Sequence, residues 1–172
     1  PLQRHIHRTV RHLAPGDQLA TGVDGCSAPN FAMPLARLAH IYCRLACDDS
    51  AEWSALRFAM TRHPDVVSGT RRPDLAFFQT GSMKRIGDWV AKSGADGMLA
   101  LGVRSKGIGI AIRVADGNGR ALYKTATTLL QLIGLLGDPA RTPLARFAQS
   151  AVRNDRGLMV GRLEPCFKLR TS

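Results

Sequence analysis

Trp89-Val90-Ala91-Lys92-Ser93-Gly94-Ala95-Asp96-Gly97 is the stretch from which the fold of this chain can be worked outward. It is a short apolar run ending in Lys-Ser-Gly, and two further apolar runs follow at residues 98–103 and 108–114. Glycines and a basic turn at residues 104–107 separate these runs. Short apolar runs bounded by glycine are typical of strands joined by hairpins. The pattern therefore predicts three adjacent strands, with Lys92 near the end of the first.

Helices are predicted on both sides of these strands. Apolar residues recur at helical spacing over residues 3–13, 35–45, 53–60 and 122–136. Pro15-Gly16-Asp17 is expected to end the first helix, and Gly137-Asp138-Pro139 the last. Asp116-Gly117-Asn118-Gly119 fits either a hairpin or a loop into the last helix, and residues 157–169 are expected to form one or two edge strands. This order predicts an α+β fold, an antiparallel sheet packed with helices.

Composition limits the classes of protein that the chain can belong to. Its 172 residues suffice for one domain with a core, and no apolar run is long enough to cross a bilayer. The net charge of +11 is compatible with binding to nucleic acid. However, the basic residues are dispersed along the chain, and aromatic residues, on which bases could stack, make up only 6%. Cys26, Cys43, Cys47 and Cys166 do not form a secreted disulfide pattern. The composition therefore favours a cytoplasmic protein without a membrane partner, and it disfavours nucleic acid as a partner.

The tripeptide Lys92-Ser93-Gly94 can be interpreted either as a catalytic motif or as the ordinary end of a strand. Lys-Ser-Gly or Lys-Thr-Gly is the third motif of the serine β-lactamases and penicillin-binding proteins. There the glycine lets substrate lie close to the strand, and the lysine supplies positive charge or a proton relay. The plain interpretation is an exposed lysine at the end of a strand, and the tripeptide alone favours it.

Two cysteine-containing stretches contain residue types that can bind a metal ion. Asp24-Gly25-Cys26 could combine a metal ligand with a carboxylate that supports it, or could be an ordinary turn, which the Asp-Gly dipeptide favours. Cys43 and Cys47 lie one helical turn apart, with His40 on the same face. Buried thiols that pack as small apolar groups are the simpler interpretation of that pair.

Four stretches, taken in order, resemble the type II L-asparaginase family of the Rhizobium kind. The opening Pro1-Leu2-Gln3 and the ending Phe167-Lys168-Leu169-Arg170 are also similar to that family, so the resemblance covers essentially the whole chain. It implies a serine-β-lactamase-like fold and hydrolysis of the L-asparagine side-chain amide to L-aspartate and ammonia. The four stretches are Thr21-Gly22-Val23-Asp24-Gly25-Cys26-Ser27-Ala28-Pro29, Arg62-His63-Pro64-Asp65-Val66-Val67-Ser68-Gly69, Lys92-Ser93-Gly94-Ala95-Asp96-Gly97 and Gly107-Ile108-Gly109-Ile110-Ala111-Ile112-Arg113-Val114-Ala115-Asp116-Gly117-Asn118-Gly119.

The resemblance also implies the roles of particular residues. Lys92 matches the lysine that works with a second serine, and Asp24 matches the aspartate that supports a lysine of the metal site; both are expected to be catalytic. Cys26 matches one of the ligands of a zinc ion. Gly25, Ser93 and Gly94 are expected to bind substrate. By the same analogy, the protein is expected to form a homodimer.

The chain departs from the family pattern in its nucleophile. The family uses Ser-x-x-Lys, and no such sequence occurs here; Ser54 and Ser68 are each followed at that spacing by arginine. We therefore expect residues 1–172 to be the C-terminal portion of one domain whose N-terminal half, with the nucleophile and the other zinc ligands, lies upstream. On this expectation the chain alone has little activity. Asp74 stands where some members have a cysteine, so no thiol role carries over.

Two other functions stay open at this point. One is a different serine amidohydrolase or a penicillin-recognising enzyme on the same scaffold, because the Lys-Ser-Gly motif is common to these enzymes. The other is a non-catalytic basic module that binds nucleic acid, which the net charge would favour.

Overall fold

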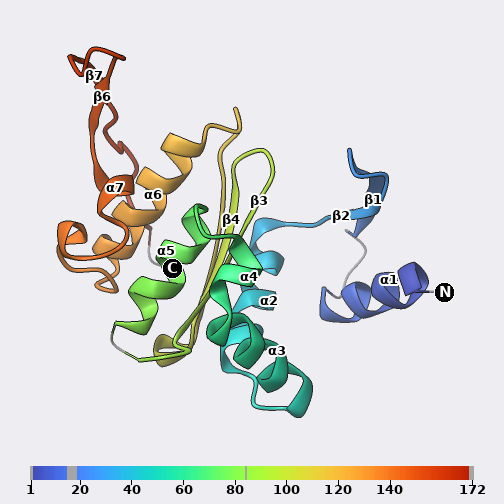
Figure 1. The fold of residues 1–172 in the computed structure, drawn as a ribbon. Helices are drawn as coiled ribbons and strands as arrows, with labels where there is room; N and C mark the ends of the chain where they lie inside the picture. Colours follow the sequence, from blue (N-terminus) through green and yellow to red (C-terminus); the bar gives the residue numbers. More distant parts are fainter. Residues whose placement is uncertain (1, 15–18, 84, 171–172) are drawn as a thin grey trace.

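The structure is a computed structural model that describes residues 2–14, 19–83 and 85–170. Figure 1 shows a central sheet with helices on both sides and two hairpins at the periphery. In order, the elements are α1 (Leu2–Leu13), β1 (Ala20–Val23), β2 (Pro29–Ala32), α2 (Leu35–Cys47), α3 (Ala51–Arg62), α4 (Pro64–Ser68), α5 (Pro73–Ser82), β3 (Trp89–Gly94), β4 (Met98–Val103), the 3₁₀ turn η1 (Arg104–Lys106), β5 (Ile108–Arg113), α6 (Gly119–Leu132), the 3₁₀ turn η2 (Pro139–Arg141), α7 (Ala145–Ala148), β6 (Ala151–Arg153) and β7 (Met159–Arg162).

The three strands predicted around Lys92 form the central sheet. Their order is β3-β4-β5, and both pairs are antiparallel. Lys92 pairs with Ala100 and Gly94 with Met98. With helices packed on this sheet, the fold is α+β, as the sequence predicts.

Helix α2 packs unusually closely on one face of the sheet. Gly102 of β4 and Gly109 of β5 are cross-strand partners, and both face this helix. A Cβ atom at Gly102 would overlap the carbonyl oxygen of Tyr42, and one at Gly109 would overlap that of Ala39. Glycine in a strand commonly marks such a close approach of two backbones. The two glycines therefore fix where α2 lies on the sheet.

The opposite face of the sheet carries the main core, to which α5 and α6 contribute. Figure 1 shows these two helices on the side of the sheet away from α2 and α3. Gly81 of α5 lies against the side chain of Trp89, where a Cβ atom would collide with the indole ring. The buried core residues here are Ala76, Phe77, Trp89, Ala91, Leu99, Leu101, Val103, Leu122, Ala126, Leu130, Leu135, Leu136 and Leu144.

The turn between β3 and β4 is joined to the loop that leads into α6. Gly97, with φ of 73°, accepts a hydrogen bond from the backbone N–H of Val114 at 2.9 Å. A Cβ atom at Gly97 would lie 3.0 Å from the Cα atom of Gly117. Asn118 caps α6 by accepting a hydrogen bond from the N–H of Ala121. The stretch at residues 116–119 is therefore a loop into a helix, one of the two predicted alternatives.

Two antiparallel hairpins lie at the edges of the molecule. The hairpin β1–β2 packs with α1, where the rings of His7 and Phe31 lie 5.6 Å apart. The hairpin β6–β7 projects on the other side (Figure 1), and all residues of β7 are exposed. Within residues 157–169 the structure thus has one strand, at 159–162, which pairs with β6. No helix within the described ranges is long and apolar enough to cross a bilayer.

The structure corrects one expectation about a helix end and leaves two untested. The last long helix ends at Leu132 and not at residue 136, because Gly134 adopts φ of 72° and turns the chain. Leu136 is still buried, since the turn directs it back into the core. Pro1 of the opening motif and the expected helix end at Pro15-Gly16-Asp17 lie outside the described residues.

Candidate active site

Asp74 lies in the first turn of α5 and reaches the edge strand β3. Pro73 begins this helix, and an acidic residue in the first turn interacts favourably with the helix dipole. The side chain of Asp74 is fully buried. Its Oδ1 accepts a hydrogen bond from the backbone N–H of Ser93 at 3.0 Å, and its Oδ2 lies 3.4 Å from Nζ of Lys92. A buried carboxylate needs such partners, because desolvation without them costs several kcal/mol.

Lys92 lies between this carboxylate and solvent. Its Nζ donates a hydrogen bond to the carbonyl of Ser93 at 2.7 Å, and its side chain is 39% exposed. The ammonium group is thus held on two sides while part of the side chain remains accessible. This arrangement positions a cation at the end of β3, where a substrate could approach it.

Two tyrosines lie close enough to Asp74 to be affected by its charge. Tyr42 of α2 is half-buried, and burial, followed by the negative charge of Asp74, raises its pKa to about 12. Burial likewise raises the pKa of Tyr123 of α6; a hydrogen bond with Ser93 opposes this shift and the charge of Asp74 adds to it. Tyr42 and Tyr123 come from helices on opposite faces of the sheet, so the carboxylate influences both faces.

The successive residues Lys92, Ser93 and Gly94 differ in their surroundings. Side chains alternate between the two faces along a strand, which places Lys92 towards α2 and Ser93 towards α6. Ser93 is half-buried and interacts with the hydroxyl of Tyr123, while Gly94 is exposed. A Cβ atom at Gly94 would lie 3.2 Å from Cβ of Met98, tighter than an ordinary contact. The structure therefore brings together Lys92, Ser93, Asp74 and Tyr123.

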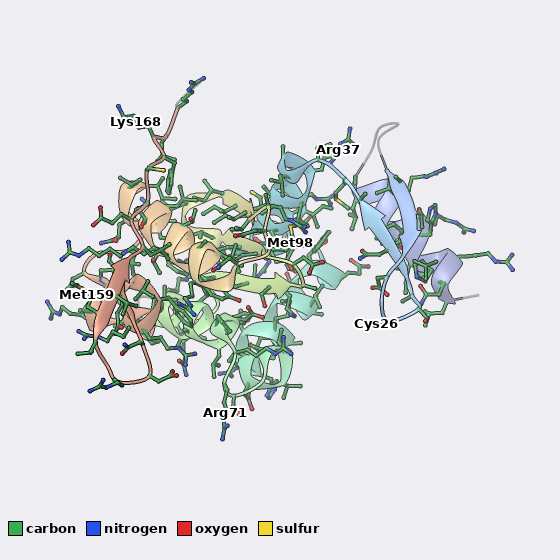
Figure 2. All side chains as sticks on the ribbon, turned by 90° about the horizontal axis from the view of Figure 1, so that it is seen from above. Cys26, Arg37, Arg71, Met98, Met159 and Lys168 are labelled. Atoms are coloured by element: carbon green, nitrogen blue, oxygen red, sulfur yellow. The ribbon has the colours of Figure 1, made fainter. Side chains whose placement is uncertain are left out.

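Asp24, Gly25 and Cys26 lie elsewhere, in the exposed turn between β1 and β2. Oδ1 of Asp24 accepts hydrogen bonds from the N–H groups of Cys26 at 2.9 Å and of Ala28 at 3.2 Å. Asp24 thus closes an ordinary turn, as the Asp-Gly dipeptide predicts. Figure 2 shows Cys26 far from Met98, the cross-strand partner of Gly94. The catalytic role of Asp24, the substrate-binding role of Gly25 and the zinc-binding role of Cys26 therefore stay predictions.

The described part of the chain contains no group of three or more His, Cys, Asp or Glu side chains placed to hold a metal ion. Sγ of Cys43 donates to the carbonyl of Gly107 at 3.2 Å, so this thiol is engaged with the loop after η1. Burial, followed by the neighbouring Cys43, raises the pKa of Cys47, which disfavours the thiolate that a metal requires. The residues described here do not by themselves fit a zinc ion.

Sequence reasoning singled out Lys92 and Ser93 but not their partners. In the sequence Asp74 is only a departure from a family pattern, and Tyr42 only falls within the helical stretch predicted at residues 35–45. The local signal at Asp74 is proline at the first helical position followed by an acidic residue, which marks a helix start. Nothing in the sequence connects that helix start to Lys92, which is 18 residues away.

The structure thus combines an antiparallel sheet covered by helices with a site at the end of its edge strand β3. In this site a buried carboxylate lies beside a partly exposed lysine. Comparison with protein families gives a match to the model of L-asparaginase II over residues 1–165. The chain therefore belongs to the L-asparaginase II family. A search of curated proteins finds no match. Family membership supports an asparaginase-type amidohydrolase function and implies asparagine as the substrate.

Proposed function

We propose that this protein is an L-asparaginase of the Rhizobium kind that hydrolyses the L-asparagine side-chain amide to L-aspartate and ammonia. The observation that carries the proposal is the position of Lys92. In a chain of the L-asparaginase II family, its Nζ is held 2.7 Å from the carbonyl of Ser93 and 3.4 Å from Oδ2 of Asp74. A serine-β-lactamase-like fold belongs to the same proposal, supported by an edge strand that carries Lys-Ser-Gly in an antiparallel sheet.

Lys92 acts in this proposal as a cation and proton donor. The carboxylate of Asp74 interacts favourably with an ammonium group and far less with a neutral amine. Amide hydrolysis needs positive charge near the developing oxyanion and a proton for the departing ammonia. An ammonium at the accessible end of β3 can supply both.

The nucleophile in the proposed reaction is a serine outside these 172 residues, because Ser-x-x-Lys is absent from them. Its oxygen attacks the side-chain carbonyl carbon of asparagine as the hydroxyl gives up its proton. The C–N bond then breaks as the nitrogen takes up one proton, so that ammonia leaves with no net change in protons. Water hydrolyses the resulting aspartyl ester, which releases L-aspartate and regenerates the serine. The chemistry thus follows the acyl-transfer pattern of serine nucleophiles.

The backbone N–H of Ser93 does not serve as an oxyanion donor here, since it already donates to Oδ1 of Asp74 at 3.0 Å. The remaining donors at this place are Nζ of Lys92 and the hydroxyls of Ser93 and Tyr123. We assign the oxyanion contact to Lys92, because a charged donor gives the stronger hydrogen bond.

Three further parts of the proposal do not enter this mechanism. Zinc binding through Cys26 would need ligands outside the described residues. A homodimer and a cytoplasmic location follow from family analogy and from composition alone.

The test is ammonia release from L-asparagine by this chain and by a version extended upstream, each with and without Lys92→Ala. Activity of the extended protein should fall by about 10²–10⁴-fold in kcat/KM on Lys92→Ala. Lys168→Ala is the matched control, since Lys168 is exposed near the end of the chain and should leave the rate unchanged. Full activity of the Lys92→Ala protein would refute the role of the lysine, and no activity in either length would refute the asparaginase proposal.

A second candidate is a penicillin-recognising or other serine amidohydrolase, which the placement of Lys92-Ser93-Gly94 on an edge strand also favours. Incubation of the extended protein with a β-lactam distinguishes the two. A stable mass increase equal to the β-lactam, together with no ammonia release from asparagine, would replace the first proposal by this one.

A further inference from the structure

An arginine-lined cleft lies on the α3 side of the molecule, apart from the Asp74–Lys92 site. Its volume is about 390 Å³. Four arginines from three segments contribute to it, and no acidic residue is among its lining residues. The lining residues are Ser54, Arg57, Phe58, Thr61, Arg62, Arg85, Ile86, Gly87 and Arg104.

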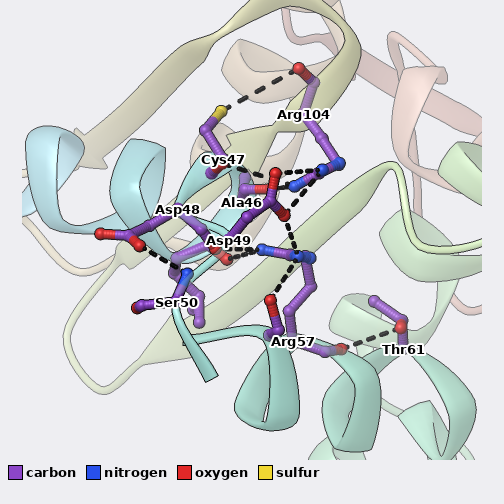
Figure 3. A network of polar contacts seen from close by, with 10 residues as sticks. Ala46, Cys47, Asp48, Asp49, Ser50, Arg57, Thr61 and Arg104 are labelled. Atoms are coloured by element: carbon purple, nitrogen blue, oxygen red, sulfur yellow. Dashed lines mark hydrogen bonds and ion pairs between the residues drawn. The ribbon is translucent and has the colours of Figure 1, made fainter. Parts of the chain in front are cut away.

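Two of these arginines form a fixed wall. Arg57 donates to Oδ1 of Asp49 at 3.0 Å and to the carbonyl of Asp48 at 2.9 Å. Arg104 donates to both carboxylate oxygens of Asp49, at 2.8 and 2.9 Å, and to the carbonyl of Ala46. Figure 3 shows the two guanidinium groups converging on Asp49. Both guanidinium groups contact Asp49, and the negative charge of Asp88 also acts on Arg104. The charges of this wall are therefore largely compensated, and the cations of the cleft without a carboxylate contact in the described chain are the other two arginines.

The other two arginines, Arg62 and Arg85, are exposed, and neither forms an ion pair with a carboxylate of the described chain. The guanidinium of Arg62 lies over the Phe58 ring, 5.3 Å from its centroid, and both residues line the cleft. The planar guanidinium fork matches the geometry of phosphate oxygens, and its hydration is weaker than that of lysine. Two such groups on a concave surface whose lining contains no acidic residue attract an anion.

The rim of the cleft is apolar. Phe58 is 60% exposed and Ile86 is 68% exposed, although both are large hydrophobic residues. An inorganic ion would leave this apolar surface in water, whereas an organic substituent on a phosphate would cover it. A volume of about 390 Å³ is within the range of pockets for small molecules.

We propose that this cleft binds a small organic phosphate, whose phosphate group lies between Arg62 and Arg85 and whose organic part covers Phe58 and Ile86. This binding function is independent of the asparaginase proposal. The wall formed by Arg57 and Arg104 gives the cleft a fixed side, since both side chains are held by hydrogen bonds to the chain between α2 and α3. The positive charge that attracts the phosphate comes from Arg62 and Arg85.

Isothermal titration with inorganic phosphate and with adenosine monophosphate, in a buffer without other multivalent anions, tests the proposal. We expect saturable binding of both, with adenosine monophosphate at least about threefold tighter because it covers the apolar rim. Arg62→Gln with Arg85→Gln should weaken both by at least about tenfold, which corresponds to about 1.4 kcal/mol. Arg156→Gln with Arg170→Gln removes the same charge at exposed positions outside the cleft and should change binding less than about twofold.

Three outcomes would overturn the proposal. The first is no saturable binding of either phosphate by the wild-type protein. The second is equal weakening by the cleft variant and by its charge-matched control, which would indicate general electrostatic attraction. The third is affinity for oligonucleotides that rises with their length and survives Arg62→Gln with Arg85→Gln. Thermal unfolding without phosphate should be the same for all variants, which verifies that folding is intact.

Discussion

The carboxylate of Asp74 is entirely buried, yet it lies 3.4 Å from the ammonium nitrogen of Lys92, whose side chain is 39% exposed. One member of this ion pair therefore lies in the protein interior, and the other reaches solvent at the end of the edge strand β3. Asp74 also accepts a hydrogen bond from the backbone N–H of Ser93. It therefore holds both the main chain of β3 and the side chain of Lys92 in place. The predictions below test this relationship and the packing that supports it.

Asp74→Asn should weaken both stability and activity. The amide can still accept the hydrogen bond from the N–H of Ser93, but it no longer attracts the ammonium of Lys92. We expect the free energy of unfolding in urea to fall by about 1–2 kcal/mol, less than for a fully buried pair because Lys92 reaches solvent. In a catalytically complete protein kcat should fall more than KM rises. Asp155→Asn, in the exposed β6–β7 turn, is the control; equal stability of the two variants would contradict the structural role of Asp74.

Tyr42 should ionise at about pH 12, detectable as tyrosinate absorbance during an alkaline titration. Because its folded-state pKa lies above the ordinary value near 10, its ionisation opposes folding, and stability should fall as the pH rises from about 10 to 12. Tyr42→Phe should reduce this loss. Asp74→Asn should lower the pKa of Tyr42 only part of the way towards 10, because burial is the larger cause. An unchanged alkaline titration in Tyr42→Phe would contradict the assignment.

Asp48 should contribute to stability at neutral pH and lose that contribution in acid. The backbone N–H of Ser50, followed by the side chain of Arg44, lowers its pKa to about 2. With a folded pKa below the ordinary value near 4, the contribution is complete above about pH 4 and disappears as the pH falls towards 2. Asp48→Asn should therefore destabilise the protein at pH 6 but much less at pH 2.5, as measured by urea unfolding. Equal destabilisation at both pH values would show that the carboxylate charge is not involved.

Gly102→Ala should be strongly destabilising, because the new methyl group would overlap the carbonyl oxygen of Tyr42. Helix α2 would have to move away from the sheet, at a cost of about 1–3 kcal/mol or more, visible as a fall in Tm of several degrees. Gly22→Ala in the exposed strand β1 has no atom within 4 Å of the new Cβ and should be neutral. The two substitutions have the same chemistry, so similar effects would argue against close packing of α2 on β4.

The three central strands and most helices could be predicted from the sequence because their signals are local. Glycine-bounded apolar runs predicted β3, β4 and β5, and the apolar stripe around Leu122 predicted α6. Helix α5 was not recognised, since Phe77, Thr80 and Gly81 have low intrinsic helix propensity. That helix depends on its surroundings, because Gly81 allows the ring of Trp89 to pack against it. Tertiary packing here overrides a weak local preference.

The site could be predicted only in part for a similar reason. Lys92 was recognised by a motif within one strand, whereas its contact with Asp74 forms only when α5 docks on β3. The unpaired arginines Arg62 and Arg85 likewise come from different elements, and dispersed basic residues in the sequence gave no indication that they share a cleft.

The contact between Gly97 and Gly117 has a practical consequence for modifying this protein. Because a Cβ atom at Gly97 would already come within 3.0 Å of Gly117 and would need the left-handed φ of 73°, insertions, peptide tags and bulky fluorophores in the β3–β4 turn should disturb the loop into α6. The turn at Asn154–Leu158 is exposed and touches little else. Affinity tags and spectroscopic labels attached there should leave the geometry around Lys92 intact, which makes it the place to tether the protein for single-molecule or surface-based assays.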